Sequence, residues 1–125
     1  MSNMIRGITL ARSELLALLF YVADGVVEGA TRLQKVVFLV QSELGLGDFA
    51  FAPSRYGPWS KELEDLVQEL VDKGELTIEE REPRELQERP AKVYRASPRL
   101  VEQGRAAFRR LRQLDPALAF MLYTR

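Results

Sequence analysis

Apolar residues recur at helical spacing through the first part of the chain. Residues 13–23 are apolar on most sides, which predicts a buried central helix. From Thr31, a good N-cap, apolar positions follow at i, i+3, i+4 and i+7 until Gly45. The same spacing begins again after Ser60 and continues to Gly74, with carboxylates in the first turn, where the helix dipole favours anions. The pattern therefore predicts three helices.

The rest of the chain combines strand and helix signals. Residues 76–78 and 91–96 read as two strands around a charged loop, which predicts a β-hairpin. Ser97 stands before a proline and predicts a fourth helix, and Asp115, again before a proline, predicts a short apolar tail helix. Residues 48–56, between the second and third helices, predict a short extended segment or edge strand, because the proline within it cannot donate to a strand ladder.

Three helices, a hairpin and a further helix, in that order, are typical of a winged-helix architecture. Elements contiguous in sequence tend to pack together, and strands after helices fit an α+β arrangement. The chain has 125 residues, which is the size of one domain. We therefore expect a single winged-helix-like α+β domain over residues 1–125, with three helices, a two-stranded β-hairpin wing, a C-terminal helix and a short apolar tail helix.

The composition argues against most enzyme classes. The chain has no cysteine and no histidine, which removes thiolate nucleophiles, the commonest general base and the commonest metal ligands. Glu62, Asp65 and Glu69 share one face of the third predicted helix, where they could hold Mg²⁺ or form an ordinary solvated face. Because charge runs on helices are usually solvated, we expect no catalytic residue, no metal and no cofactor.

No stretch of the chain is apolar for long enough to span a membrane. The longest apolar run, residues 15–23, has nine residues, against about 20 for a spanning helix. The first eleven residues lack the continuous apolar core of a signal peptide. We therefore expect a cytoplasmic protein with no membrane partner.

The net charge of zero hides an asymmetry along the chain. Residues 1–57 carry five bases and five acids, residues 58–90 carry five bases and eleven acids, and residues 91–125 carry eight bases and two acids. Such asymmetry bears on partners. In one interpretation the acidic and basic parts face each other, within the chain or across a homodimer. In the other, the basic part binds nucleic acid.

Duplex DNA is a possible partner of a winged helix, whose last helix before the hairpin normally enters the major groove. Here that helix carries five acids against two lysines, which repels phosphate. A phosphate grip would have to come from other positions. The candidates near the helix starts are Arg32, Lys35, Arg55 and Lys61, and those in the wing are Arg81, Arg84 and Arg89.

The turn Tyr56-Gly57-Pro58-Trp59-Ser60 allows two interpretations. Tyr56 and Trp59 could anchor a binding partner, since aromatic residues are frequent in interaction hot spots. Alternatively, the glycine and proline shape the turn, Ser60 caps the next helix and Trp59 packs over the core. The second interpretation is the simpler.

The tail helix is apolar nearly all round, so both of its sides need to be covered. The cover could be the chain's own core or the seam of a homodimer, in which the arginine-rich fourth helix of one copy meets the acidic third helix of the other. The expected dimer contacts are Arg105, Arg109, Arg112, Leu118, Phe120, Met121 and Leu122.

One region of the sequence resembles a known family. The residues that carry the resemblance are Thr31–Leu39, Phe49, Phe51, Tyr56–Ser60, Leu63, Leu66, Leu70 and Gly74. They are similar to the YwgA-like family of mostly uncharacterised prokaryotic proteins and, more distantly, to the SocA-like, or Panacea, antitoxin domain. The likeness covers residues 29–78 and implies protein partners, because SocA-like proteins are described as antitoxins and protease adaptors.

Two functional hypotheses follow from the sequence. The first is a non-enzymatic regulatory or adaptor-type module that acts through protein–protein interaction, with a protein partner or as a homodimer. The alternative is a winged-helix transcriptional regulator that binds duplex DNA. The winged-helix pattern favours the alternative, and the acidic third helix favours the first hypothesis.

Overall fold

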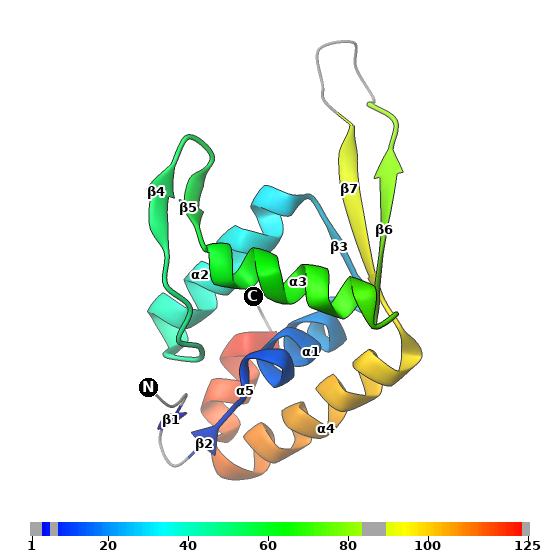
Figure 1. Cartoon of the computed structure of the whole chain (residues 1–125). Helices are drawn as coiled ribbons and strands as arrows, with labels where there is room; N and C mark the ends of the chain where they lie inside the picture. The colour runs from blue at the N-terminus through cyan, green and yellow to red at the C-terminus, as the bar shows by residue number, and fades with distance from the viewer. Residues whose placement is uncertain (1–3, 6–7, 84–89, 124–125) are drawn as a thin grey trace.

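A computed structural model gives the structure of the chain, and it describes residues 4–5, 8–83 and 90–123. In this part of the chain the fold is α+β, with five helices and small antiparallel sheets (Figure 1). The elements are β1 (Met4–Ile5), β2 (Ile8–Thr9), α1 (Arg12–Val22), β3 (Val26–Glu28), α2 (Ala30–Leu44), β4 (Ala52–Ser54), β5 (Gly57–Trp59), α3 (Lys61–Asp72), β6 (Leu76–Arg81), β7 (Ala91–Ala96), α4 (Pro98–Leu114) and α5 (Pro116–Tyr123).

Helix α1 forms the centre of the core. Every residue from 15 to 20 is buried, as expected for a helix that is apolar on most sides. Helix α4 packs along α1 so closely that a Cβ atom on Gly104 would overlap the carbonyl oxygen of Ala17. Gly104 therefore sets the distance between the two helices.

Strands β3, β7 and β6 form a three-stranded antiparallel sheet in that order. The predicted hairpin is confirmed as β6 and β7, and β6 continues three residues beyond the predicted strand, to Arg81. The third strand, β3, was not predicted. It has only three residues and lies between Gly25 and Gly29, whose φ angles are +85° and +102°. Three residues are too few to show a strand pattern.

Residues 48–56 contain the short strand β4. It pairs with β5 in a second hairpin, and Gly57 takes a φ of +102° just after the turn. Pro53 lies opposite Pro58 in the register. The predicted short strand is thus confirmed, but its pairing with β5 was not predicted, because a proline in each strand obscures a strand pair of only three residues a side.

Helix starts follow the predicted capping residues with one exception. Ser60, Ser97 and Asp115 each accept a hydrogen bond from a backbone N–H three residues later, at 3.1, 3.0 and 3.0 Å. The prediction of Thr31 as an N-cap was wrong, because α2 begins at Ala30 after Gly29, whose positive φ turns the chain out of β3. Thr31 lies exposed in the first turn.

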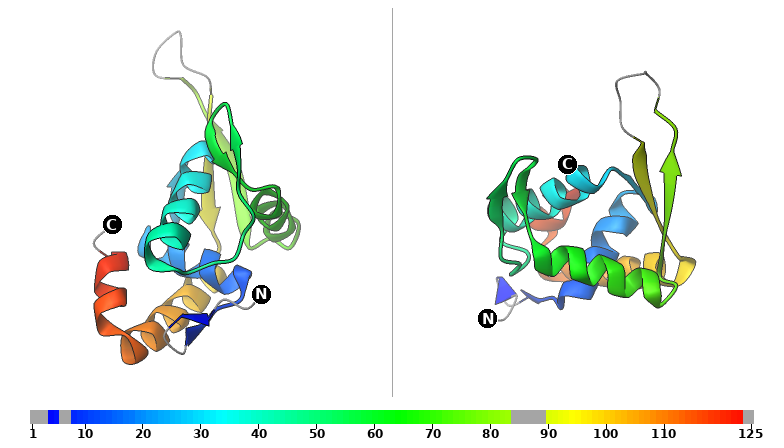
Figure 2. Two further views of the ribbon diagram at one scale, coloured as in Figure 1. Left: turned by 90° about the vertical axis from the view of Figure 1, so that its left-hand side faces the viewer. Right: turned by 45° about the horizontal axis from the view of Figure 1, so that its top comes forward.

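The two hairpins project from the same side of the helical body (Figure 2). Helix α3 runs across the body between their bases, and α2 passes behind it (Figure 1). None of the helices in residues 10–83 and 90–123 combines the length and the apolar character needed to cross a bilayer.

Candidate interaction surfaces

The side chain of Gln34 fixes the start of α3 on α2. Its amide nitrogen donates to the carbonyl oxygen of Ser60 at 3.0 Å, and its amide oxygen accepts from the N–H of Ser60 at 2.8 Å. Both residues are buried, with 4% and 0% of their surface exposed. The pairing satisfies the buried N–H of Ser60 and adds a second donor to its carbonyl oxygen, which also accepts from the N–H of Glu64. It also sets where α3 begins.

Gln41, two turns further along α2, makes the same kind of pairing. Its amide nitrogen donates to the carbonyl oxygen of Phe49 and its amide oxygen accepts from the N–H of Phe49, both at 2.8 Å. The two glutamines thus hold both ends of the segment that contains the β4–β5 hairpin. Sequence reasoning missed this role. The available signal was a pair of polar residues at i and i+7 beside the apolar stripe of α2.

Arg12 joins three segments at the same end of α3. Its Nε lies 2.7 Å from an oxygen of Asp48, and a terminal nitrogen lies 3.3 Å from Glu62. The hydrogen bond with Asp48 raises the pKa of Arg12, and the nearby negative charge of Glu62 adds to this rise. The second oxygen of Glu62 accepts from the N–H of Ala50 at 2.7 Å. These bonds orient α3 relative to α1 and the loop before β4.

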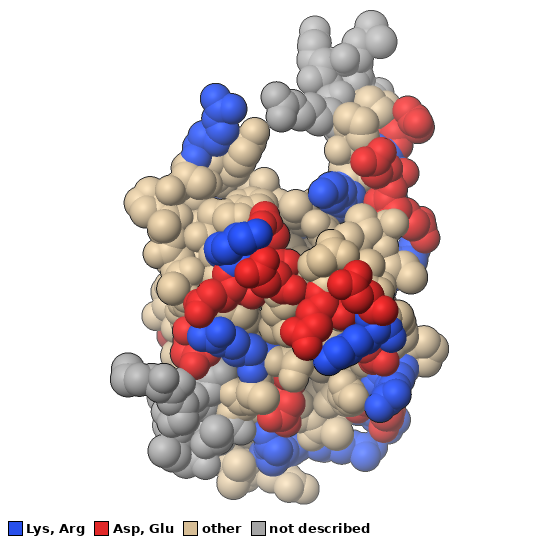
Figure 3. Space-filling view, in the orientation of Figure 1, with Lys and Arg blue, Asp and Glu red and all other residues tan. Residues whose placement is uncertain are grey.

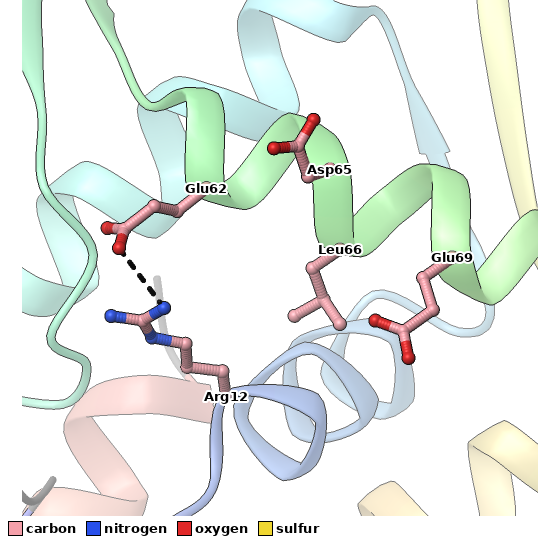
Figure 4. Close-up of a pocket in the computed structure, with 5 residues that line it drawn as sticks. All are labelled: Arg12, Glu62, Asp65, Leu66 and Glu69. Carbon is pink, nitrogen blue, oxygen red and sulfur yellow. Dashed lines mark ion pairs between the residues drawn. The ribbon is translucent and has the colours of Figure 1, made fainter.

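A shallow hollow of about 330 Å³ lies between α1 and α3. Its lining consists of Arg12, Glu62, Asp65, Leu66 and Glu69. Figure 4 shows Leu66 pointing from α3 toward α1, between the carboxylates of the helix, while Arg12 reaches Glu62 at one end. Carboxylates around a half-buried leucine suit a cationic side chain with an aliphatic stem.

The predicted magnesium alternative finds no support in the arrangement of these acids. Within the described ranges, no three His, Cys, Asp or Glu side chains converge as metal ligands would. Glu62 is turned toward Arg12 instead. The carboxylates of α3 therefore form a solvated acidic face, which appears as a red band across the molecule in Figure 3.

The two lysines of this region are bound to acids of the same helix. Lys61 lies 2.9 Å from Glu64 and 3.1 Å from Asp65, and Lys73 lies 3.0 Å from Glu69. Hydrogen bonds to Glu64 and Asp65 raise the pKa of Lys61. The face of α3 therefore offers neighbours more carboxylate than ammonium. We call residues 61–73 on this side the acidic face.

The cationic residues predicted for phosphate contacts separate into two groups. Arg32, Lys35 and Arg55 are exposed and make no ion pair with any residue that the structure describes. Lys61 is paired as above, and Arg81 donates to both oxygens of Glu28 at 2.8 and 2.7 Å. Arg84 and Arg89 lie outside the described residues.

Tyr56 and Trp59 have different environments. Tyr56 lies in the turn between β4 and β5 and is 50% exposed. Trp59 is half-buried in β5, with Ala52 opposite in the register. Tyr56 is therefore accessible to a partner, whereas Trp59 belongs partly to the packing of the hairpin.

The tail helix α5 covers one of its sides with the chain's own core. Leu118 and Leu122 are only 4% and 2% exposed, so the prediction of both as dimer contacts was wrong. Their burial leaves Phe120 and Met121 on the exposed side, at 70% and 45%. The sequence could not say which side is covered, because both are apolar.

The acidic and basic parts of the chain are adjacent through β6 and β7, but their charges pair very little. Among the described residues, Arg95 and Glu79, at 3.1 Å across β6 and β7, form the ion pair between residues 58–90 and 91–125. The arginines predicted for a dimer are exposed on α4, where Arg105 makes a long contact of 3.7 Å with Glu102 and Arg109 and Arg112 make none with described acids. Most acids of residues 58–90 and most bases of residues 91–125 therefore do not neutralise each other and remain exposed on the surface.

Comparisons of the chain with protein-family models, with curated proteins and with solved structures found no match in any of the three.

Proposed function

We propose that the chain is a non-enzymatic binding module of the regulatory or adaptor type, which acts through protein–protein interaction. Its acidic face on α3 binds a basic segment of a protein partner. The observation that carries this proposal is that residues 61–73 hold five carboxylates against two lysines, and that both lysines are paired with acids of the same helix. Charge complementarity then selects a cationic partner.

The proposal includes a winged-helix architecture. It is supported by the order of α1, β3, α2, α3, β6 and β7 and by the strand order β3–β7–β6, in which a strand after the first helix joins the later hairpin. In this architecture α3 has the place of the DNA-recognition helix, and the β6–β7 hairpin is the wing. The surface of α3 therefore decides between the two hypotheses.

The DNA-binding alternative is favoured by this topology and opposed by the charge of α3. Duplex DNA carries one phosphate charge per about 1.7 Å of axis, and a bound protein gains affinity by replacing condensed cations with its own. Carboxylates on the inserted helix would add repulsion there. Since Lys61 is paired with Glu64 and Asp65, it cannot make up for this without breaking those contacts.

The resemblance to the YwgA-like and SocA-like proteins is part of the proposal. It is supported by the contact between its two most specific motifs, since Gln34 of Leu33-Gln34-Lys35 binds Ser60 of the Tyr56–Ser60 turn. A paired motif of this kind would serve to position α3. The protein partners that the likeness implies agree with the acidic face.

Fluorescence anisotropy with two labelled probes tests the proposal. One probe is a peptide in which arginine and leucine alternate, and the other is a random-sequence DNA duplex, both at about 50 mM salt. We expect saturable binding of the peptide and duplex binding at least tenfold weaker. A duplex that binds more tightly than the peptide would overturn the proposal in favour of the DNA-binding alternative.

A further inference from the structure

A second surface, opposite in charge to the acidic face, lies between the two hairpins. The N–H of Gly29 donates to the carbonyl oxygen of Lys92 at 2.7 Å, so the start of α2 lies directly beside β7. Arg32 and Lys35 follow in the first turns of α2, and both are exposed. Three cations thus come together from two elements far apart in sequence.

The strand register gives the direction of Lys92. Tyr94, two residues later on β7, is 5% exposed and belongs to the core. Residues i and i+2 of a strand share a face, so Lys92 lies on the face of the sheet that looks toward the helices and the other hairpin. Glu80 lies opposite Lys92 in the register, so it shares this face of the sheet, on the edge strand β6.

The β4–β5 hairpin supplies the opposite wall. Arg55 lies in its turn beside Tyr56, with the guanidinium 5.9 Å from the centre of the tyrosine ring. The pairings of Gln34 and Gln41 fix this hairpin against α2. Figure 3 shows the outline of the molecule hollowed between the hairpins, with Lys or Arg side chains on both walls. We call Arg32, Lys35, Arg55 and Lys92 the basic saddle.

The cations of the saddle are not neutralised, unlike those of α3 and of the β6–β7 hairpin's outer face. None of the four makes an ion pair with a described residue, whereas Lys61, Lys73, Arg81 and Arg95 all do. Four cations beside the single carboxylate of Glu80 leave the saddle with a net positive charge, and a concave surface of one net sign concentrates ions of the opposite sign. A polyanion is therefore the class of ligand that the saddle fits.

We propose that the basic saddle binds single-stranded nucleic acid. Its cations follow the phosphate backbone, and Tyr56, which is 50% exposed, supplies a face on which a base can stack. Proteins that bind single strands combine a cationic groove with aromatic platforms in this way. A duplex offers no unstacked base to Tyr56, and its second strand would meet the acids of β6 and α3. The saddle is separate from the acidic face, so this proposal goes beyond the proposed function.

A matched pair of triple variants tests the proposal. Arg32→Ala/Lys35→Ala/Lys92→Ala removes three cations from the saddle, and Arg99→Ala/Arg109→Ala/Arg112→Ala removes three exposed arginines without described ion pairs from α4. The probe is labelled oligothymidine of about 15 nucleotides, with a duplex of equal length as comparison. Thermal melts followed by circular dichroism confirm that both variants fold.

We expect the wild-type chain to bind oligothymidine more tightly than the duplex. The saddle variant should lose at least tenfold in affinity, and its salt slope should fall by about 2, since each phosphate contact on a single strand contributes about 0.7. The α4 variant should stay within twofold of wild type. Tyr56→Ala should bind about tenfold more weakly, the effect of one lost base stack.

Several results would overturn the proposal. The first is a wild-type chain that fails to bind oligothymidine at about 50 mM salt. Equal losses in the two triple variants would mean that the net charge of the chain, and not the saddle, determines the affinity for oligothymidine.

If the duplex binds more tightly than oligothymidine and Tyr56→Ala has no effect, the ligand of the saddle is duplex DNA and not a single strand. If equimolar polyglutamate displaces the oligonucleotide, the ligand is an acidic protein. Binding of the arginine–leucine peptide to the acidic face is measured on the same variants, which separates failure here from failure of the proposed function.

Discussion

The side chain of Gln34 and the backbone of Ser60 form a closed pair of hydrogen bonds across 26 residues of sequence. The amide of Gln34 takes the place of a neighbouring strand, donating to the carbonyl oxygen and accepting from the N–H of the same residue. Ser60 then caps α3 through its hydroxyl. The position of α3, and hence of the acidic face, depends on this contact.

Replacing Gln34 by alanine should therefore destabilise the fold. The variant leaves the N–H of Ser60 buried without a partner, while its carbonyl oxygen still accepts from the N–H of Glu64. An unsatisfied buried group costs about 1–3 kcal/mol, so we expect the free energy of unfolding in urea to fall by about 2 kcal/mol. Gln113→Ala, at an exposed position of α4, should change it by no more than about 0.5 kcal/mol. A fall no larger than that of the control would show that water replaces the amide.

Gly104→Ala should strongly destabilise the fold, although alanine is intrinsically a better helix former than glycine. Alanine is favoured over glycine within a helix by about 1 kcal/mol. At this position, however, the added Cβ meets the backbone of Ala17, which cannot yield as a flexible side chain would. We expect a loss of at least about 2 kcal/mol in unfolding free energy, since overpacking typically costs about 1–3 kcal/mol. A variant more stable than wild type would contradict the close packing of α1 and α4.

Tyr94 should make stability fall at alkaline pH. Burial raises the pKa of its phenol above the ordinary value of 10.0, and the negative charge of Glu64 adds to the rise. The neutral phenol is thus favoured in the folded state, and its contribution is complete below pH 10.0 and lost as the pH rises through the higher folded-state pKa. Urea unfolding at increasing pH should show a smaller alkaline loss for Tyr94→Phe than for wild type. Identical losses would refute the assignment to this residue.

Elements with local signals could be predicted from the sequence. Helices α3 and α4 begin at Ser60 and Ser97, whose hydroxyls cap the backbone within three residues, and their apolar stripes repeat over several turns. Such signals need no knowledge of the rest of the fold. The β6–β7 hairpin follows from the same local logic.

Features that depend on distant partners could not be predicted. Strand β3 has three residues and pairs with β7 more than sixty residues later. The role of Gln41 depends on the backbone of Phe49, which only the folded loop brings into reach. Likewise, counts of charge along the chain did not show that Lys61 and Arg81 are neutralised while Arg32 and Lys35 are not, because ion pairing is a tertiary property.

The acidic face itself is tested most directly by charge reversal. Asp65→Lys/Glu69→Lys reverses two carboxylates of α3, and Glu80→Lys/Glu82→Lys makes the same change in charge on and just beyond β6. All four positions are exposed, so both variants should keep the fold. The measurement is the affinity of the labelled arginine–leucine peptide at about 50 mM salt. We expect at least a tenfold loss for the α3 variant and less than a twofold change for the β6 variant. Equal effects of the two variants would contradict binding at the acidic face.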